Sequence, residues 1–344
     1  MRIALTADPE LPVPPKLYGG IERIIDMLAR GLVARGHDVT VFAHPDSATA
    51  GRLVAWPGRS SGSFVDTTRN GALLAEETLR RRFDVIHSFS RIAYLAPLLP
   101  LSVPKIMTYQ RAISPRSIRW SDALSRGTLS FTAISQWMMR EVSGIGAWDV
   151  IPNGVSLDVY RYQRDVSHDA PLVFLGRIEE IKGPHLAIEI ARRVGRRLVI
   201  AGNIPEDKRE WAQRHVLSGV DGHLIQYVGA VDDAQKSKLL GEASALLMPI
   251  LWEEPFGIVM AEAMACGTPV LGLARGAVPE VVEDGATGFV RNSVDELVDA
   301  AERLHTLDRA QCRNRVERLY SQNAIVEQYL ALYRRRTRMR TRAA

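Results

Sequence analysis

The stretch Glu253–Gly288, EEPFGIVMAEAMACGTPVLGLARGAVPEVVEDGATG, combines two carboxylates with the predicted start of a helix. Glu254 precedes Pro255 and Gly257, which favour a helix N-terminus, and Glu262 follows eight positions later. If the whole interval is helical, a rise of about 1.5 Å per residue separates the carboxylates by roughly 12 Å along the axis. They lie about 80° apart around the axis, so both can face the same side.

The free N–H groups at the start of this predicted helix form a natural phosphate site. An elongated ligand with a diphosphate between two hydroxyl-bearing rings suits such a layout, and a nucleotide-sugar is such a ligand. The alternative explanation is a buried amphipathic helix with one solvent-exposed glutamate and one at its N-terminus.

Length and composition indicate a soluble protein of two domains. The chain has 344 residues, of which 46% are hydrophobic and 24% charged, and one ordinary core rarely serves a chain of this length. No run of eighteen apolar residues occurs, so no membrane span is expected, and no signal peptide is expected at the N-terminus. Cys266 and Cys312 make no disulfide framework or metal motif. We predict a cytoplasmic protein.

The net charge of +5 is concentrated at the C-terminus. Six arginines lie between Arg334 and Arg342, and without them the net charge is 5 − 6 = −1. No nucleic-acid-binding motif accompanies them, so no nucleic-acid partner is expected. The tail is either frayed and solvated or makes weak contact with anionic lipid at the inner membrane face.

Strand-like and helical segments alternate along the chain, which predicts an α/β protein with doubly wound parallel sheets. The first half begins with a strand at 2–6 and the second half restarts with a strand at 172–175. A polar stretch at 161–170 marks the expected linker. We therefore predict domains at 1–160 and 161–322, followed by a crossover helix and basic tail at 323–344. The site is expected at the carboxyl ends of both sets of strands.

The motif around Glu254 and Glu262 resembles the Glu-x7-Glu signature of retaining glycosyltransferases of family 4. The resemblance implies a GT-B fold, with two Rossmann-like domains and a last helix that crosses back to the first domain. In that family the first glutamate lies beside the transferred sugar and the second binds the ribose. The backbone from Phe256 through Gly257 and Ile258 to Val259 approaches the sugar and the distal phosphate.

Two cations follow the first strand of the second half. Gly176-Arg177 and Lys182-Gly183 place positive charge at a strand's carboxyl end, where it can bind a diphosphate. The segment resembles the family's Gly-Arg…Lys-Gly block, so Arg177 and Lys182 are expected to act with Glu254 as catalytic residues. The alternative is two surface cations paired weakly with Glu179 and Glu180.

Further donor contacts are expected from loops. Gly19-Gly20 precedes the first helix, where the backbone can approach a ligand closely. The family uses this loop against the donor phosphates. Gly202 and Val231 follow later strands and border the nucleobase pocket by resemblance. No GxGxxG motif follows the first strand, which disfavours a nicotinamide enzyme.

The first half is expected to bind the acceptor, through Glu22, His87, Phe89 and Gln110. His87 ends a predicted strand, and a buried structural histidine is the alternative explanation for it. Many relatives have histidines where this chain has Phe89 and Gln110, so the resemblance implies no general base from this half.

The sequence therefore predicts a retaining, hexosyltransferase-type enzyme that transfers a sugar from a nucleoside-diphosphate sugar to an acceptor hydroxyl. A UDP-sugar is expected in preference to a GDP-sugar. No cofactor or metal is expected, because no Asp-x-Asp motif occurs and the cations can neutralise the phosphates. A non-catalytic nucleotide-sugar-binding protein or partner subunit is the alternative.

Overall fold

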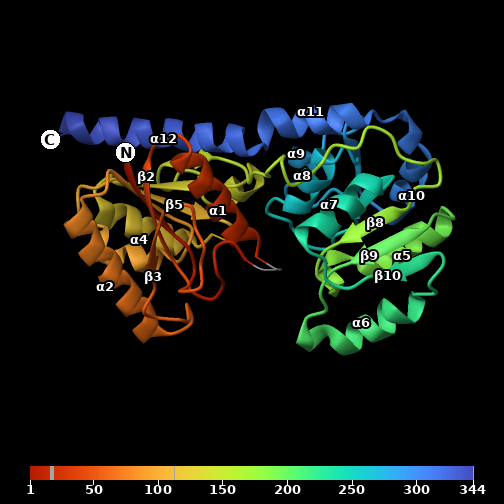
Figure 1. Ribbon diagram of the computed structural model, residues 1–344, viewed down its shortest axis with the longest axis horizontal. Coiled ribbons are helices and arrows are strands. Elements are labelled where there is room, and N and C mark those ends of the chain that lie inside the picture. Colours follow the sequence, from red (N-terminus) through yellow and green to blue (C-terminus); the bar gives the residue numbers. More distant parts are fainter. Residues whose placement is uncertain (16–18, 112, 344) are drawn as a thin grey trace. The chain divides into compact units, whose positions relative to one another are not determined.

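The computed structural model describes residues 1–15, 19–111 and 113–343. The chain forms two compact units, one of Met1–Gly154 with Gln322–Ala344 and one of Val155–Ser321 (Figure 1). Each unit is built on one parallel sheet with helices packed against it. In the described residues no helix is both long and apolar enough to cross a membrane.

The first unit holds a seven-stranded parallel sheet in the described residues. Its strands, in spatial order, are β3 (Arg52–Ala55), β2 (Asp38–Ala43), β1 (Arg2–Thr6), β4 (Val85–Ser88), β5 (Lys105–Tyr109), β6 (Leu129–Ala133) and β7 (Trp148–Val150). Its helices are α1 (Gly20–Val33), α2 (Phe64–Arg81), α3 (Ile92–Leu95), α4 (Pro115–Ser125) and α12 (Gln322–Ala343).

The second unit holds a six-stranded parallel sheet in the described residues. Its strands, in spatial order, are β10 (Ile225–Tyr227), β9 (Leu198–Ala201), β8 (Leu172–Leu175), β11 (Ala245–Met248), β12 (Val270–Leu273) and β13 (Gly288–Arg291). Its helices are α5 (Pro184–Arg193), α6 (Arg209–His215), α7 (Asp233–Glu242), α8 (Ile258–Ala265), α9 (Val278–Val281), α10 (Val294–Glu302) and α11 (Arg309–Leu319).

The two sheets share one topology: the second and third strands of each unit lie on one side of its first strand, and the later strands lie on the other side. In the first unit β1 lies between β2 and β4, and in the second unit β8 lies between β9 and β11. Successive right-handed crossovers then place helices on both faces of each sheet. Central strands of the second sheet are apolar, as strands covered on both faces usually are; LVFL in β8 and ALLM in β11 are examples. Buried strands of the first sheet also carry polar residues, such as β4 (VIHS) and β6 (LSFTA). The predicted doubly wound α/β class is confirmed.

The last helix belongs to the first unit. α12 packs against α1, where Gly31 is so close to Val326 that an added Cβ would lie 2.5 Å from a Val326 methyl carbon. The helix continues through the arginine-rich segment to Ala343, and Arg335 forms a 2.6 Å ion pair with Asp149. The basic tail is therefore helical in the described residues. Its contact with anionic membranes stays a prediction.

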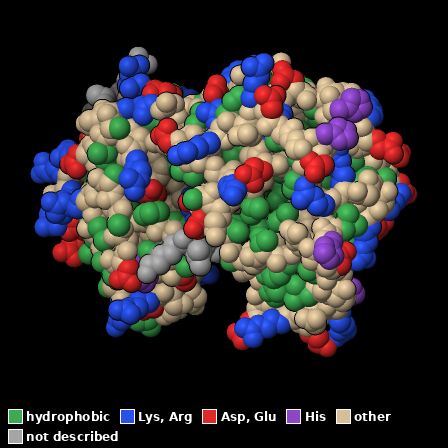
Figure 2. Space-filling view, turned by 45° about the vertical axis from the view of Figure 1, so that its right-hand side comes forward, with side chains coloured by type: hydrophobic (Ala, Val, Ile, Leu, Met, Phe, Trp, Pro, Cys, Tyr) green, Lys and Arg blue, Asp and Glu red, His purple; other side chains and the backbone are tan. Residues whose placement is uncertain are grey.

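Acidic and basic side chains alternate over the face shown in Figure 2. Lys and Arg (blue) are interspersed there with Asp and Glu (red), with apolar side chains between them. The excess positive charge of the chain is therefore not gathered on that face.

A buried polar cluster attaches α12 to the first sheet. His87 of β4 is fully buried, with Nδ1 2.6 Å from the Tyr333 hydroxyl and Nε2 2.5 Å from the Thr108 hydroxyl. The Tyr329 ring packs 4.8 Å from the imidazole. Burial lowers the pKa of His87 from 6.5 to about 3, so the imidazole stays neutral in the folded protein.

We predict that this histidine makes stability fall in mild acid. Between pH 6.5 and 3 the unfolded chain binds a proton at His87 that the folded chain does not, so stability drops as pH falls. His87→Gln removes this term. The stability advantage of the wild type over His87→Gln should shrink by about 2 kcal/mol between pH 7 and pH 5. Urea unfolding at both pH values measures it.

His168→Gln is the matched control, because it makes the same substitution at an exposed position outside the buried cluster. Parallel profiles for the wild type and His87→Gln would show that the imidazole does not titrate on unfolding as the buried cluster requires.

Candidate functional site

The predicted donor residues of the second unit lie at the carboxyl ends of its strands, whereas Gly19 and Gly20 belong to the first unit. Arg177 follows β8, Gly202 follows β9 and Glu254 follows β11. β8 and β11 are the neighbours between which the strand order reverses. Connections leave in opposite directions at such a point and open a crevice between them, where ligands of α/β proteins bind.

Glu254 is held by two donors on one carboxylate oxygen. Its Oε2 lies 2.7 Å from Lys182 Nζ and accepts a 3.0 Å hydrogen bond from the indole N–H of Trp252. Lys182 also lies over the Trp252 ring, 4.4 Å from its centroid. Glu254 is 8% exposed, so its charge is compensated within a largely buried group.

Glu262 is held in the same way. Its Oε1 accepts a 2.5 Å hydrogen bond from the Tyr160 hydroxyl and lies 2.6 Å from Lys236 Nζ. Lys236 lies 5.2 Å from the centre of the Tyr160 ring. Glu262 is 3% exposed and sits within α8.

The helix between the two glutamates begins just after Gly257, close to the predicted N-terminus. α8 begins at Ile258, and Gly257 before it has a left-handed backbone with φ of 72°. The helical rise behind the estimate of roughly 12 Å applies only from Ile258 onward, because the chain turns at Gly257. Ile258 and Val259 form the first turn and are partly exposed, whereas the Phe256 ring is buried against Tyr320 at 5.5 Å. The Phe256 side chain is therefore not available to a ligand.

The backbone of Glu254 is in tight contact with Gly276. Gly276, with φ of 58°, lies so close that an added Cβ would be 2.2 Å from the Glu254 carbonyl oxygen. The next residue, Ala277, donates its N–H to that oxygen at 2.8 Å. A left-handed glycine is required at this contact.

Arg177, Gly202 and Val231, the other donor residues predicted in the second unit, are partly exposed. Arg177 forms a 2.8 Å ion pair with Glu179, as the surface-pair interpretation allowed. Gly202 accepts a 2.9 Å hydrogen bond from the Tyr227 hydroxyl at its carbonyl oxygen. Val231 is partly exposed before α7.

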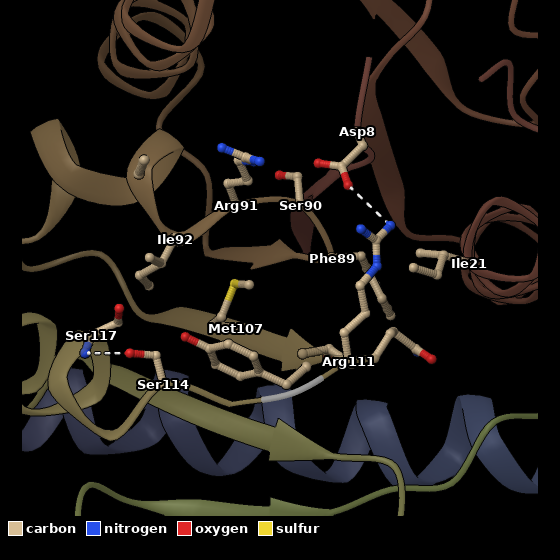
Figure 3. Close-up of a pocket in the computed structure, with 14 residues that line it drawn as sticks. Asp8, Ile21, Phe89, Ser90, Arg91, Ile92, Met107, Arg111, Ser114 and Ser117 are labelled. Carbon is tan, nitrogen blue, oxygen red and sulfur yellow. Dashed lines mark hydrogen bonds and ion pairs between the residues drawn. The ribbon is translucent and has the colours of Figure 1, made fainter. Parts of the chain in front are cut away.

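The first unit contains a pocket of about 520 Å³ at the ends of β1, β4 and β5 (Figure 3). Phe89, Gln110 and Ile21 line it, together with Asp8, Ser90, Arg91, Ile92, Ala93, Met107, Thr108, Tyr109, Arg111, Ser114 and Ser117. Arg111 and Asp8 point toward each other at 3.8 Å. The lining combines apolar side chains with both signs of charge, as a site for an amphipathic, hydroxyl-bearing molecule would.

Asp8 is the group in this pocket that sequence reasoning missed. Its Oδ1 is buried and has no hydrogen-bond partner among the described residues. Burial and the nearby Glu10 raise the pKa of Asp8, although Arg111 and Arg91 oppose the shift. No motif points to Asp8; only its position two residues after β1 could have done so.

Of the other residues predicted for the acceptor side, two lie outside the pocket lining. His87 is buried in the cluster that holds α12, which favours its structural interpretation. Glu22 lies in the first turn of α1, where burial raises its pKa. An added Cβ on Gly19 would lie 2.8 Å from the Glu22 carboxylate, so Gly19 is closely packed on that side chain, whereas an added Cβ on Gly20 would meet no atom within 4 Å. Gln110 forms a reciprocal pair of 2.8 Å amide hydrogen bonds with Asn153.

Sequence reasoning also missed the residues that hold the two glutamates. Trp252 lies two positions before Glu254 and could have been suspected from that proximity. Tyr160 and Lys236 are 102 and 26 positions from Glu262, so only the fold brings them together.

Comparisons with known proteins agree with this architecture. A model described as "Glycosyltransferase Family 4" matches residues 18–159, and one described as "Glycosyl transferases group 1" matches residues 170–306. The chain is 28% identical to glycogen synthase of Mycobacterium tuberculosis (strain ATCC 25618 / H37Rv), over 80% of this chain and 79% of that protein. It is also 28% identical to phosphatidyl-myo-inositol mannosyltransferase of Mycobacterium leprae (strain TN), over 84% and 83%.

A similar solved structure is AviGT4, described as a glycosyltransferase involved in avilamycin A biosynthesis. It superposes with a TM-score of 0.73 at 26% identity, over 98% of both chains. The two family models together match most of the chain, and the fold agrees with them. The chain is therefore a glycosyltransferase of family 4 with the GT-B fold.

We predict that the contact under Glu254 does not tolerate a side chain. Gly276→Ala forces a methyl group into the Glu254 backbone and keeps an unfavourable φ, so the protein should lose roughly 2 kcal/mol or more of stability. Gly285→Ala is the matched control, because Gly285 has φ of 75° with no atom within 4 Å of an added Cβ. Thermal unfolding of both variants measures the difference, and equal losses would contradict the contact.

Proposed function

We propose that the chain is a retaining, metal-independent glycosyltransferase that uses a nucleoside-diphosphate sugar, with a hexose as the transferred group. The observation that supports this proposal lies in the second unit, where Lys182 pairs with the buried Glu254 shortly before α8, Glu262 is buried within α8, and Arg177 follows β8, the neighbour of β11. Acidic groups suit hydroxyl-bearing rings, and cations with a helix N-terminus suit a diphosphate.

In the proposed reaction the bond from the sugar C1 to the diphosphate oxygen breaks, and C1 bonds to an acceptor oxygen. The leaving diphosphate gains negative charge while the sugar ring becomes cationic. Arg177 and Lys182 would stabilise the departing diphosphate together with the N–H groups of Ile258 and Val259. This stabilisation removes the need for a divalent ion. A UDP-sugar remains the expected donor.

Glu254 would hold the sugar and stabilise the cationic ring, while Glu262 would bind the ribose hydroxyls. Retention is explained by attack from the face that the diphosphate leaves, with a phosphate oxygen of the donor accepting the proton of the acceptor hydroxyl. No proton acceptor from the first unit is then required.

We assign acceptor recognition to the pocket of the first unit. Its apolar side chains, serines and charged groups suit a hydroxyl-bearing acceptor (Figure 3). The relatives are named for products as different as glycogen, a mannosylated phosphatidyl-inositol and avilamycin A. The proposal therefore specifies the acceptor only by its hydroxyl.

We predict that the two cations are needed for turnover. Arg177→Ala and Lys182→Ala should each lower donor turnover by about 10²-fold, the scale typical of losing one preorganised charge contact. The wild type is first assayed with a panel of UDP- and GDP-sugars, and the variants are then assayed with the donor that it uses. Lys208→Ala removes an exposed lysine paired with Asp207 and serves as the control.

Near-normal turnover in both cation variants would contradict the phosphate assignment. Binding of a nucleotide-sugar by the wild type, without turnover in the presence of hydroxyl acceptors, would instead support the alternative of a non-catalytic binding protein.

A further inference from the structure

The two glutamates of the second unit are held by matching sets of side chains. Each carboxylate pairs with one lysine and accepts a hydrogen bond from one aromatic residue, and the lysine lies over the ring of that same aromatic residue. The two sets are Lys182 with Trp252 on Glu254, and Lys236 with Tyr160 on Glu262.

In each set both donors converge on one carboxylate oxygen. The indole N–H of Trp252 and the Lys182 ammonium both reach Oε2 of Glu254. The Tyr160 hydroxyl and the Lys236 ammonium both reach Oε1 of Glu262. Within the described residues no hydrogen bond or ion pair reaches the second oxygen of either carboxylate. One oxygen is saturated and the other remains able to accept a hydrogen bond.

The aromatic residue has two effects in each set. Its N–H or O–H fixes the rotation of the carboxylate, and its ring face attracts the ammonium, which limits where the lysine can move. A carboxylate held by two directional donors is preorganised, so its second oxygen points in one direction before a ligand arrives.

We propose that Trp252 and Tyr160 are positioning residues for two different parts of the donor. Trp252 acts through Glu254 on the transferred sugar, and Tyr160 acts through Glu262 on the ribose. The inference rests on the proposed function, which assigns these parts of the donor to the two glutamates. The new element is that Trp252 orients the glutamate that binds the sugar and Tyr160 orients the glutamate that binds the ribose.

The two aromatic residues therefore have separable effects on catalysis. A contact to the sugar strengthens as charge develops at C1, so its loss lowers kcat. A contact to the ribose is the same in the ground state and the transition state, so its loss weakens binding and leaves kcat nearly unchanged.

Trp252→Phe and Tyr160→Phe test this division, because each variant keeps an aromatic ring and removes the hydrogen-bond donor; Tyr160→Phe loses only the hydroxyl, whereas Trp252→Phe also replaces the indole by the smaller phenyl ring. Trp252→Phe should lower kcat about tenfold and leave the dissociation constant of the free nucleoside diphosphate within about twofold. Tyr160→Phe should weaken nucleoside diphosphate binding about tenfold and leave kcat within about twofold. UDP and GDP are titrated calorimetrically, and kcat is measured with the donor found in the panel.

Trp252→Leu adds a test of the ring itself. It removes both the N–H and the surface under Lys182, so it should weaken nucleoside diphosphate binding as well as lowering kcat. Tyr162→Phe and Trp120→Phe are matched controls at partly exposed aromatic residues that do not contact either glutamate, and both should behave like the wild type.

Equal changes in binding and in kcat for both phenylalanine variants would contradict the proposal and indicate a general loss of structure. Wild-type values in both variants would also contradict it. A wild-type protein that binds neither UDP nor GDP and turns over no donor would instead overturn the proposed function, so the two failures are distinguishable.

Discussion

The compensation of two buried carboxylates determines how the second unit is arranged around its site. Glu254 and Glu262 are 8% and 3% exposed, and burial of an ionised carboxylate is costly unless it is paired and hydrogen-bonded. Lys182 and Lys236 supply the pairing, and Trp252 and Tyr160 supply the hydrogen bonds. Removal of either lysine leaves an uncompensated charge, so the four side chains must be considered together with the glutamates.

The side chains that stabilise the two buried glutamates also prepare them to bind a donor. Groups that hold the carboxylates in place without a ligand also fix the direction of the remaining oxygens. Such a site needs little rearrangement when charge develops in a bound donor, which is the property that electrostatic catalysis requires. The tight contact of Gly276 with the backbone of Glu254 and the left-handed Gly257 before α8 serve the same purpose.

The alternation of strands and helices made the fold predictable from the sequence. The strands at 2–6 and 172–175 have the predicted bounds, because buried parallel strands are short apolar runs bounded by polar loops. β3 and β13 were not predicted. β3 (RLVA) has no buried residue, and β13 (GFVR) begins with glycine and ends with arginine, so neither is a clear buried apolar run.

The candidate site could be predicted only where its residues are close in the sequence. Glu254, Glu262, Arg177 and Lys182 lie in short motifs. Lys236 and Tyr160 come from other elements, and no pattern connects them with Glu262 before the chain folds. For His87 the sequence suggested a site residue, because it lies at the end of a strand. In the structure Tyr333 of α12, 246 positions later in the chain, contacts the imidazole and helps to bury it.

The most direct test of the account is the anomeric configuration of the product formed in excess EDTA. Proton NMR during turnover, recorded before the sugar can equilibrate, compares the configuration at C1 in the donor with that in the transferred or released sugar. The account predicts retained configuration and a rate that EDTA does not change, because protein cations and the helix N-terminus stabilise the diphosphate. An inverted product, or turnover that stops when metals are chelated, would contradict it.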